Sequence, residues 1–270
     1  MSSNDPSTPL NGDLWALVPA AGQGRRMAAS EPKQYLPINN EPMLLHTLRR
    51  LSSHPQVVGL VVVLAADDRH FSSLDISALK SGLPGSLSTV IGGASRSESV
   101  VRGLEKIAEL AFIPEADKDE PRRLPWVLVH DAARPCIRHS DIDALLGQVD
   151  DQGGLLGLEV TDTLWQQDDQ RRCLRTLPRD QLMRAQTPQL FPLTGLLAAL
   201  RACHRDDFQP TDEAEAMRHS GYAPRLIGGS ADNIKVTRAG DLALAEFYLQ
   251  QQQIAANTEQ EAVNRQRGQP

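Results

Sequence analysis

Cysteine is scarce in this 270-residue chain. Its three cysteines are Cys136, Cys173 and Cys203, and no two of them have the CxxC spacing. Such a set argues against a cysteine zinc site or a disulfide framework and favours a reducing compartment. The first 13 residues also lack the basic and apolar segments of a secretory leader. We therefore expect a cytoplasmic protein.

An excess of positive charge is missing as well, because 28 Lys and Arg stand against 34 Asp and Glu, giving a net charge of -6. Proteins that bind nucleic acid usually carry a basic excess, so we expect no nucleic-acid partner. The longest apolar run, VVGLVVVLAA at 57–66, is too short to span a bilayer, so we expect no membrane span. An acidic protein that handles anions must gather its cations locally.

Common nucleotide-binding patterns are incomplete in the stretch VPAAGQGRR near the N-terminus. Gly22 and Gly24 start a GxGxxG pattern, but Met27 stands where a dinucleotide fingerprint has its third glycine. The chain has no GxxxxGK[ST] pattern, which excludes a P-loop. Two readings remain, a tight turn or a phosphate-binding loop, and the two arginines with nearby Lys33 favour the second.

Short apolar strands alternate with amphipathic helices between residues 14 and 250. This order predicts an α/β fold with a Rossmann-like, mostly parallel sheet and helices on both faces. Polar motifs follow four of the expected strands, and these motifs are PAAGQGRR, GGASR, HDAARP and TDT. Ligands bind beyond the carboxyl ends of the strands in such sheets, so the four motifs predict one composite site.

The ends of the chain are poor in apolar residues. We expect residues 1–13 and the Gln-rich residues 251–270 to be flexible tails, and 14–250 to be a single domain. The charged stretch 114–125 reads as a surface insertion.

Taken together, VPAAGQGRRM, PKQY, HDAARP, TDT, TPQ, TDEA and DNIKVT resemble the 2-C-methyl-D-erythritol 4-phosphate cytidylyltransferases of the nucleotidyltransferase superfamily. The resemblance covers about residues 14–250. It implies the nucleotide-diphospho-sugar transferase type of fold, with an extended β-arm at about 159–186 through which two subunits form a homodimer. It also implies a transferase of the non-mevalonate route of isoprenoid biosynthesis, one that moves the cytidylyl group of CTP to methylerythritol phosphate and releases pyrophosphate.

The implied nucleophile is a phosphate monoester, whose second pKa of about 6 makes it an anion without help from a general base. Positioning and positive charge are then the main needs of the site. The resemblance gives the catalytic role to Arg26, Lys33 and Lys235. It implies nucleotide binding by a mostly small-residue set: Pro19, Ala20, Ala21, Gly22, Gly24, Gly93, Ser99 and Ala132.

Base recognition is one point where the chain departs from the family pattern. Many relatives carry an acidic residue after the GG pair, and this chain has Ala94 there. Arg96 stands nearby, either as a ligand contact or in a salt bridge at the start of a helix.

The second substrate has its own implied set. The resemblance assigns methylerythritol phosphate binding to Asp131, Arg134, Thr163, Arg179, Thr187 and Lys235. Asp131 is also the implied ligand of Mg²⁺ or another divalent cation, because Mg²⁺ takes few carboxylates and completes its shell with phosphate oxygens and waters. We interpret His130 as a buried or orienting residue.

Three alternatives stay open. The enzyme could use another polyol phosphate such as ribitol 5-phosphate, or the chain could be a nucleotide-binding relative without catalysis. A hydride-transferring dehydrogenase is disfavoured by the missing third glycine.

Overall fold

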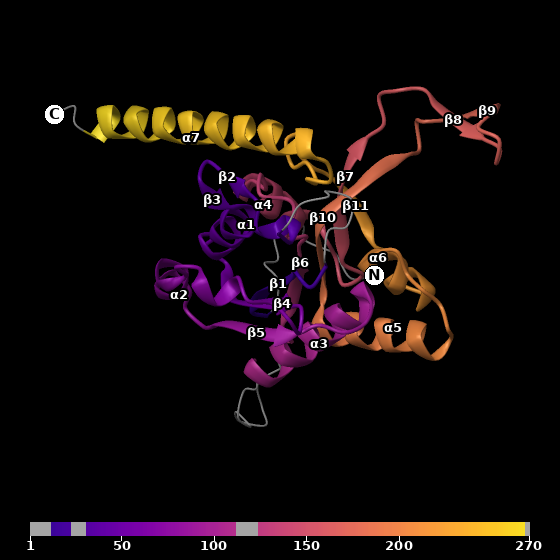
Figure 1. Ribbon diagram of the computed structural model, residues 1–270, viewed down its shortest axis with the longest axis horizontal. Helices are drawn as coiled ribbons and strands as arrows, with labels where there is room; N and C mark the ends of the chain where they lie inside the picture. The colour runs from indigo at the N-terminus through magenta and orange to yellow at the C-terminus, as the bar shows by residue number, and fades with distance from the viewer. Residues whose placement is uncertain (1–11, 23–30, 112–123, 268–270) are drawn as a thin grey trace, which may run out of the picture.

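A central sheet of seven strands organises the protein, in the order β11-β7-β10-β6-β1-β4-β5 (Figure 1). The structure is a computed structural model and describes residues 12–22, 31–111 and 124–267. Most of the expected N-terminal tail, most of the 114–125 insertion, and the predicted site residues Gly24 and Arg26 lie outside these ranges. The strands are β1 Leu14–Pro19, β4 Val57–Leu64, β5 Leu87–Ile91, β6 Trp126–Val129, β7 Gly154–Glu159, β10 Met183–Pro192 and β11 Arg225–Gly228.

The sheet is mostly parallel, as predicted. β1 runs parallel to both β4 and β6, β4 is parallel to β5, and β11 is parallel to β7. The exception is β10, which is antiparallel to β6 and β7. The sequence did not predict this strand because its first half contains three polar residues, Arg184, Gln186 and Thr187, and because Pro188 interrupts it.

Helices cover both faces of the sheet, which confirms the predicted layers. Along β1, Leu14, Ala16 and Val18 face one apolar cluster, and Trp15 and Leu17 face the other. The first cluster packs under α1 Met43–Ser52, α2 Ser77–Gly82 and α4 His139–Gln148. The second packs under α3 Arg96–Leu110, α5 Leu193–Arg205 and α6 Glu213–His219.

Small elements complete the body. Lys33–Tyr35 and Phe71–Ser73 are single turns of 3₁₀-helix, η2 and η3. β2 (Pro37–Ile38) pairs with β3 (Glu41–Pro42) in a short hairpin.

An antiparallel pair of strands extends from the body between β7 and β10 (Figure 1). These strands are β8 Leu164–Gln167 and β9 Cys173–Leu177. They fall inside the arm expected at 159–186. Trp165 and Leu174 on this arm are 57% and 58% exposed.

The last helix, α7, runs from Ala239 to Arg267 and extends past the body at its C-terminal end (Figure 1). Residues 251–267, part of the expected flexible tail, are thus helical. The segment 250–267 contains no proline or glycine and is rich in Ala, Gln and Glu, a composition that favours a helix. None of the helices in the described ranges is long and apolar enough to cross a membrane.

Candidate active site

A pocket of about 640 Å³ opens at the carboxyl ends of β1 and β6, beside the turn that follows β5. Three of the four predicted motifs meet there, PAAG, GGASR and HDAA, and the loop after β11 joins them. TDT is absent from its walls. The lining is Pro19, Ala20, Ala21, Gly22, Lys33, Gln34, Gly93, Ala94, Ser95, Arg96, Ser99, Asp131, Ala132, Ala133, Lys235 and Thr237.

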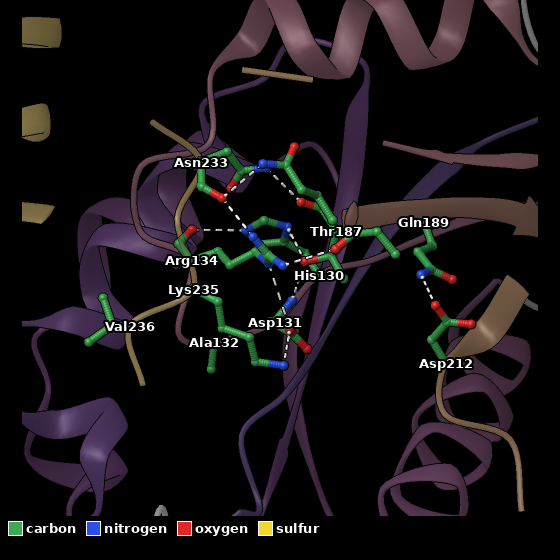
Figure 2. Close-up of polar contacts among 12 residues, drawn as sticks. His130, Asp131, Ala132, Arg134, Thr187, Gln189, Asp212, Asn233, Lys235 and Val236 are labelled. Carbon is green, nitrogen blue, oxygen red and sulfur yellow. Dashed lines mark hydrogen bonds and ion pairs between the residues drawn. The ribbon is translucent and has the colours of Figure 1, made fainter. Parts of the chain in front are cut away.

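Asp131 is the electrostatic centre of this pocket (Figure 2). Its Oδ2 lies 2.7 Å from Lys235 Nζ and 3.8 Å from Arg134 Nε, and its Oδ1 lies 3.4 Å from an Arg96 nitrogen. Burial raises the pKa of Asp131, but the charges of Lys235, Arg96 and Arg134 outweigh it and hold that pKa well below the usual range. The group is therefore a carboxylate at any physiological pH.

A buried chain of hydrogen bonds fixes Asp131 from behind (Figure 2). The Asp131 amide donates to Thr187 Oγ1 at 3.0 Å, and that hydroxyl lies 3.1 Å from His130 Nδ1. His130 Nε2 lies 3.0 Å from the Arg134 carbonyl oxygen. Burial lowers the pKa of His130 to about 4, so the ring is neutral, donates through Nε2 and accepts from the Thr187 hydroxyl at Nδ1.

Arg96 stands at the start of α3, where Ser95 accepts a hydrogen bond from the Glu98 amide and caps the helix. Its guanidinium makes two bonds to Glu213 of α6, at 2.6 and 3.1 Å, and the Glu213 side chain is 1% exposed. The Glu213 charge raises the pKa of Arg96. The expected salt bridge thus exists, but it joins two helices. Sequence reasoning missed Glu213, which is 117 residues away along the chain.

Lys235 is placed by the DNIK loop between β11 and α7. Within that loop Asn233 is fully buried, donates to the Thr187 carbonyl at 2.8 Å and accepts at its own carbonyl from Arg134 at 2.6 Å. Arg134, a predicted substrate ligand, is itself only 8% exposed and holds this loop against Asp131 (Figure 2).

Lys33 enters from η2, and its Nζ lies 3.4 Å from the Val236 carbonyl oxygen. The neighbouring Gln34 is 3% exposed and donates to the Ala20 carbonyl at 2.7 Å. That bond ties the turn carrying Lys33 to the end of β1. Gln34 was not among the predicted site residues.

Comparison with known proteins agrees with this geometry. The sequence profile of the IspD family, 2-C-methyl-D-erythritol 4-phosphate cytidylyltransferase, matches residues 14–251. A cytidylyltransferase of that name from Tolumonas auensis is 44% identical over 241 residues, covering 88% of this chain and 97% of its own. The chain belongs to this family. Its members are nucleotidyltransferases of non-mevalonate isoprenoid biosynthesis.

Other members of the IspD family are similar throughout the domain. The cytidylyltransferase of Haemophilus influenzae is 43% identical over 234 residues, covering 87% of this chain and 95% of its own. The crystal structure of the Francisella tularensis IspD matches with a TM-score of 0.67 and 30% identity, over 88% of this chain and all of that one. A second crystal structure, described as 4-diphosphocytidyl-2C-methyl-D-erythritol synthase, gives a TM-score of 0.69 and 32% identity.

The structure brings ten of the residues predicted from the family resemblance into the pocket lining. They are Pro19, Ala20, Ala21, Gly22, Lys33, Gly93, Ser99, Asp131, Ala132 and Lys235. Thr187 and Arg134 lie directly behind this lining, in contact with Asp131.

Thr163 and Arg179 lie elsewhere. Both are exposed, and neither lines the 640 Å³ pocket. Arg179 donates to the Thr161 carbonyl and lines a second hollow of about 570 Å³ at the base of the arm.

Proposed function

We propose that the pocket around Asp131 transfers the cytidylyl group of CTP to 2-C-methyl-D-erythritol 4-phosphate. The observation that carries this proposal is the 2.7 Å pair of Lys235 with Asp131, in a pocket that Lys33 also lines. A protein of net charge -6 here gathers cations around one carboxylate. Such a site suits a reaction in which two anions meet.

The chemistry follows from the charges. A methylerythritol phosphate oxygen attacks the α-phosphorus of CTP, a new P–O bond forms, and the bond to the pyrophosphate oxygen breaks. The nucleophile has a second pKa of about 6 and needs no base. Lys33 and Lys235 stabilise the charge that grows on the phosphoryl oxygens and on the leaving group. Arg26 shares this role in our proposal.

The turn after β5 is the proposed site of the cytosine base. At Gly93 an added Cβ would lie 2.4 Å from the Glu98 Cβ, so the position requires glycine. Glu98 Oε2 accepts from the Ala94 amide at 2.6 Å, and the Gly93 amide donates to Ser99 Oγ at 3.1 Å. Glu98 thus brings a carboxylate to the GG turn, where many relatives carry an acidic residue at the position of Ala94.

A divalent cation, Mg²⁺ or another, is also part of the proposal. No group of three or more His, Cys, Asp or Glu side chains in the described ranges could hold a metal ion. One carboxylate, Asp131, faces the pocket, and this fits a cation that arrives with the triphosphate and takes most of its ligands from it. Bound there, it would offset phosphate charge.

We propose that methylerythritol phosphate is bound in part by a second subunit. Thr163 and Arg179 belong to the arm segment, outside the pocket of their own chain. The exposed Trp165 and Leu174 give the arm apolar surface to bury in a homodimer. A forked cation such as Arg179 suits a phosphate monoester.

A cytoplasmic location is consistent with the three cysteines, all of which are free thiols.

Pyrophosphate release tests the proposal directly. We expect release from CTP only when methylerythritol phosphate is present, and a decrease in kcat of at least about 10²-fold for Lys235→Met. Lys80→Met, at an exposed position away from the pocket, is the matched control and keeps full activity. A folded protein that releases no pyrophosphate under these conditions, or prefers ribitol 5-phosphate, would contradict it.

A further inference from the structure

Gln252 of α7 lies behind the loops that carry the reactive groups. Its side-chain nitrogen donates to the Cys136 carbonyl at 2.8 Å and to Asp232 Oδ2 at 2.9 Å. Its side-chain oxygen accepts from Arg50 of α1 at 2.8 Å. The residue is 7% exposed, so one buried amide connects three segments that are far apart in the sequence.

Asp232 is the first residue of the DNIK loop and depends on such donors. Its Oδ2 also accepts from Arg138 at 2.9 and 2.6 Å, and its Oδ1 is buried without a hydrogen-bond partner among the described residues. A buried carboxylate is costly unless donors compensate for lost water. Removing the Gln252 donor therefore leaves the Asp232 carboxylate less well compensated, and we expect Asp232 to shift.

Lys235 follows Asp232 by three residues, so the position of Asp232 affects that of Lys235. Asn233 is fixed to Thr187, and the Val236 amide donates to the Ala133 carbonyl at 2.8 Å, so Lys235 sits on a short span with both ends tied. On α7, Ala245, Leu249 and Gln252 form one stripe. The first two pack in the small apolar cluster that contains Val236, Ala133 and Cys136.

We infer that Gln252 is a positioning residue for Lys235, acting through Asp232 to hold the DNIK loop at the distance at which Lys235 reaches Asp131 and the substrate phosphates. The match to the IspD family profile covers residues 14–251, so Gln252 lies directly after the matched range. The inference rests on the proposed role of Lys235.

Gln252→Met tests it, because methionine keeps the length and packing of the side chain and removes its hydrogen bonds. We expect kcat to fall about 10-fold, since a misplacement of about 1 Å in a catalytic group is enough for such a loss. Lys235 also reaches the phosphates of CTP, but the cytosine turn is held by Glu98 and Ser99 and not by this loop. We therefore expect the Kd of CTP in the absence of the second substrate to change by a smaller factor than kcat. Gln253→Met is the matched control, because Gln253 is exposed and bonds to Asn257.

A purely structural Gln252 would give a different result. Its replacement would lower the midpoint of thermal unfolding and leave kcat per folded enzyme unchanged, which would overturn the inference. A double-mutant cycle with Asp232→Asn adds a second readout. If Gln252 acts through Asp232, the double variant is no slower than the slower single variant, whereas multiplying effects would contradict this route.

The two proposals fail separately. Full activity of Lys235→Met would remove the proposed role of Lys235 and this inference with it. Loss of activity in Lys235→Met with normal kcat in Gln252→Met would remove only the inference.

Discussion

At the scale of single residues, the pocket is a line of alternating charges. Glu213 holds Arg96, Arg96 reaches Asp131, and Asp131 holds Lys235. Each buried carboxylate is compensated by at least one cation, as the cost of burying charge requires. The side chains of Arg96 and Lys235 are 36% and 44% exposed, so a nucleotide can reach both cations.

Glu213→Gln tests how much the buried ion pair of Glu213 with Arg96 contributes to stability. We expect the free energy of unfolding to fall by about 2 kcal/mol, less than the 3–5 kcal/mol of a fully buried pair because Arg96 is partly exposed. Glu105→Gln is the matched control, since Glu105 pairs with Arg201 at 2.7 Å with both side chains exposed. Its expected loss is about 0–1 kcal/mol. Urea unfolding measures the free energy of unfolding of both variants. An equal decrease in the two would show that burial of Glu213 does not increase the stabilisation by its ion pair.

At the scale of elements, periodicity and local composition predicted most of the central sheet. β1 and β4 are continuously apolar, which is the pattern expected of strands that are covered on both faces. β10 was not predicted because it is held in the sheet by β6 and β7, and a pairing between distant segments leaves no local sequence pattern. For α7 the reverse holds, since low apolar content suggested a tail while the helix propensity of its residues maintains the helix.

The arm gives the prediction at this scale. We mix subunits that carry Arg179→Ala with subunits that carry Lys235→Met, each inactive as a homodimer. If Arg179 acts across the dimer, a mixed dimer contains one site with both residues intact, and activity rises to about a quarter of wild type in an equal mixture with random exchange.

Pyrophosphate release after subunit exchange is the measurement. Mixing each variant with itself is the control. Mass spectrometry shows whether mixed dimers have formed. If they have formed and no activity is recovered, Arg179 acts in the site of its own chain.

At the scale of the whole molecule, acid stability depends on the buried site. Burial lowers the pKa of His130 to about 4, from 6.5 in the unfolded chain. Between these values the unfolded state binds more protons, so stability is complete above pH 6.5 and is lost as the pH falls toward 4. The pKa of Asp131 is also lowered, so its contribution is lost only below 3.8. The two windows are therefore separate.

We expect His130 to contribute up to about 3 kcal/mol to the loss of unfolding free energy between pH 6.5 and 4. Urea unfolding at several pH values measures the slope, and His130→Gln should flatten it. Burial also lowers the pKa of His54. Because the wild type and the His130→Gln variant both contain His54, the difference between their slopes comes from His130. Equal slopes would contradict a neutral, buried His130.

The sequence by itself determined the local elements and the residues able to do the chemistry. Local patterns, each spanning only a few residues, indicate the apolar strands, the amphipathic helices and the small residues of the glycine loop. The individual lining residues were predicted from the resemblance to the family motifs. The described lining also holds Gln34 and Arg96, which the predicted site left out.

Only the tertiary structure decided which charges meet. Asp131 and Lys235 are 104 residues apart, and Arg96 and Glu213 are 117 apart. No local pattern encodes such pairs, because the cost of burying each carboxylate is met by whichever cation the fold brings near. The same reason applies to Gln252, whose partners come from α1 and from two loops at the end of the sheet.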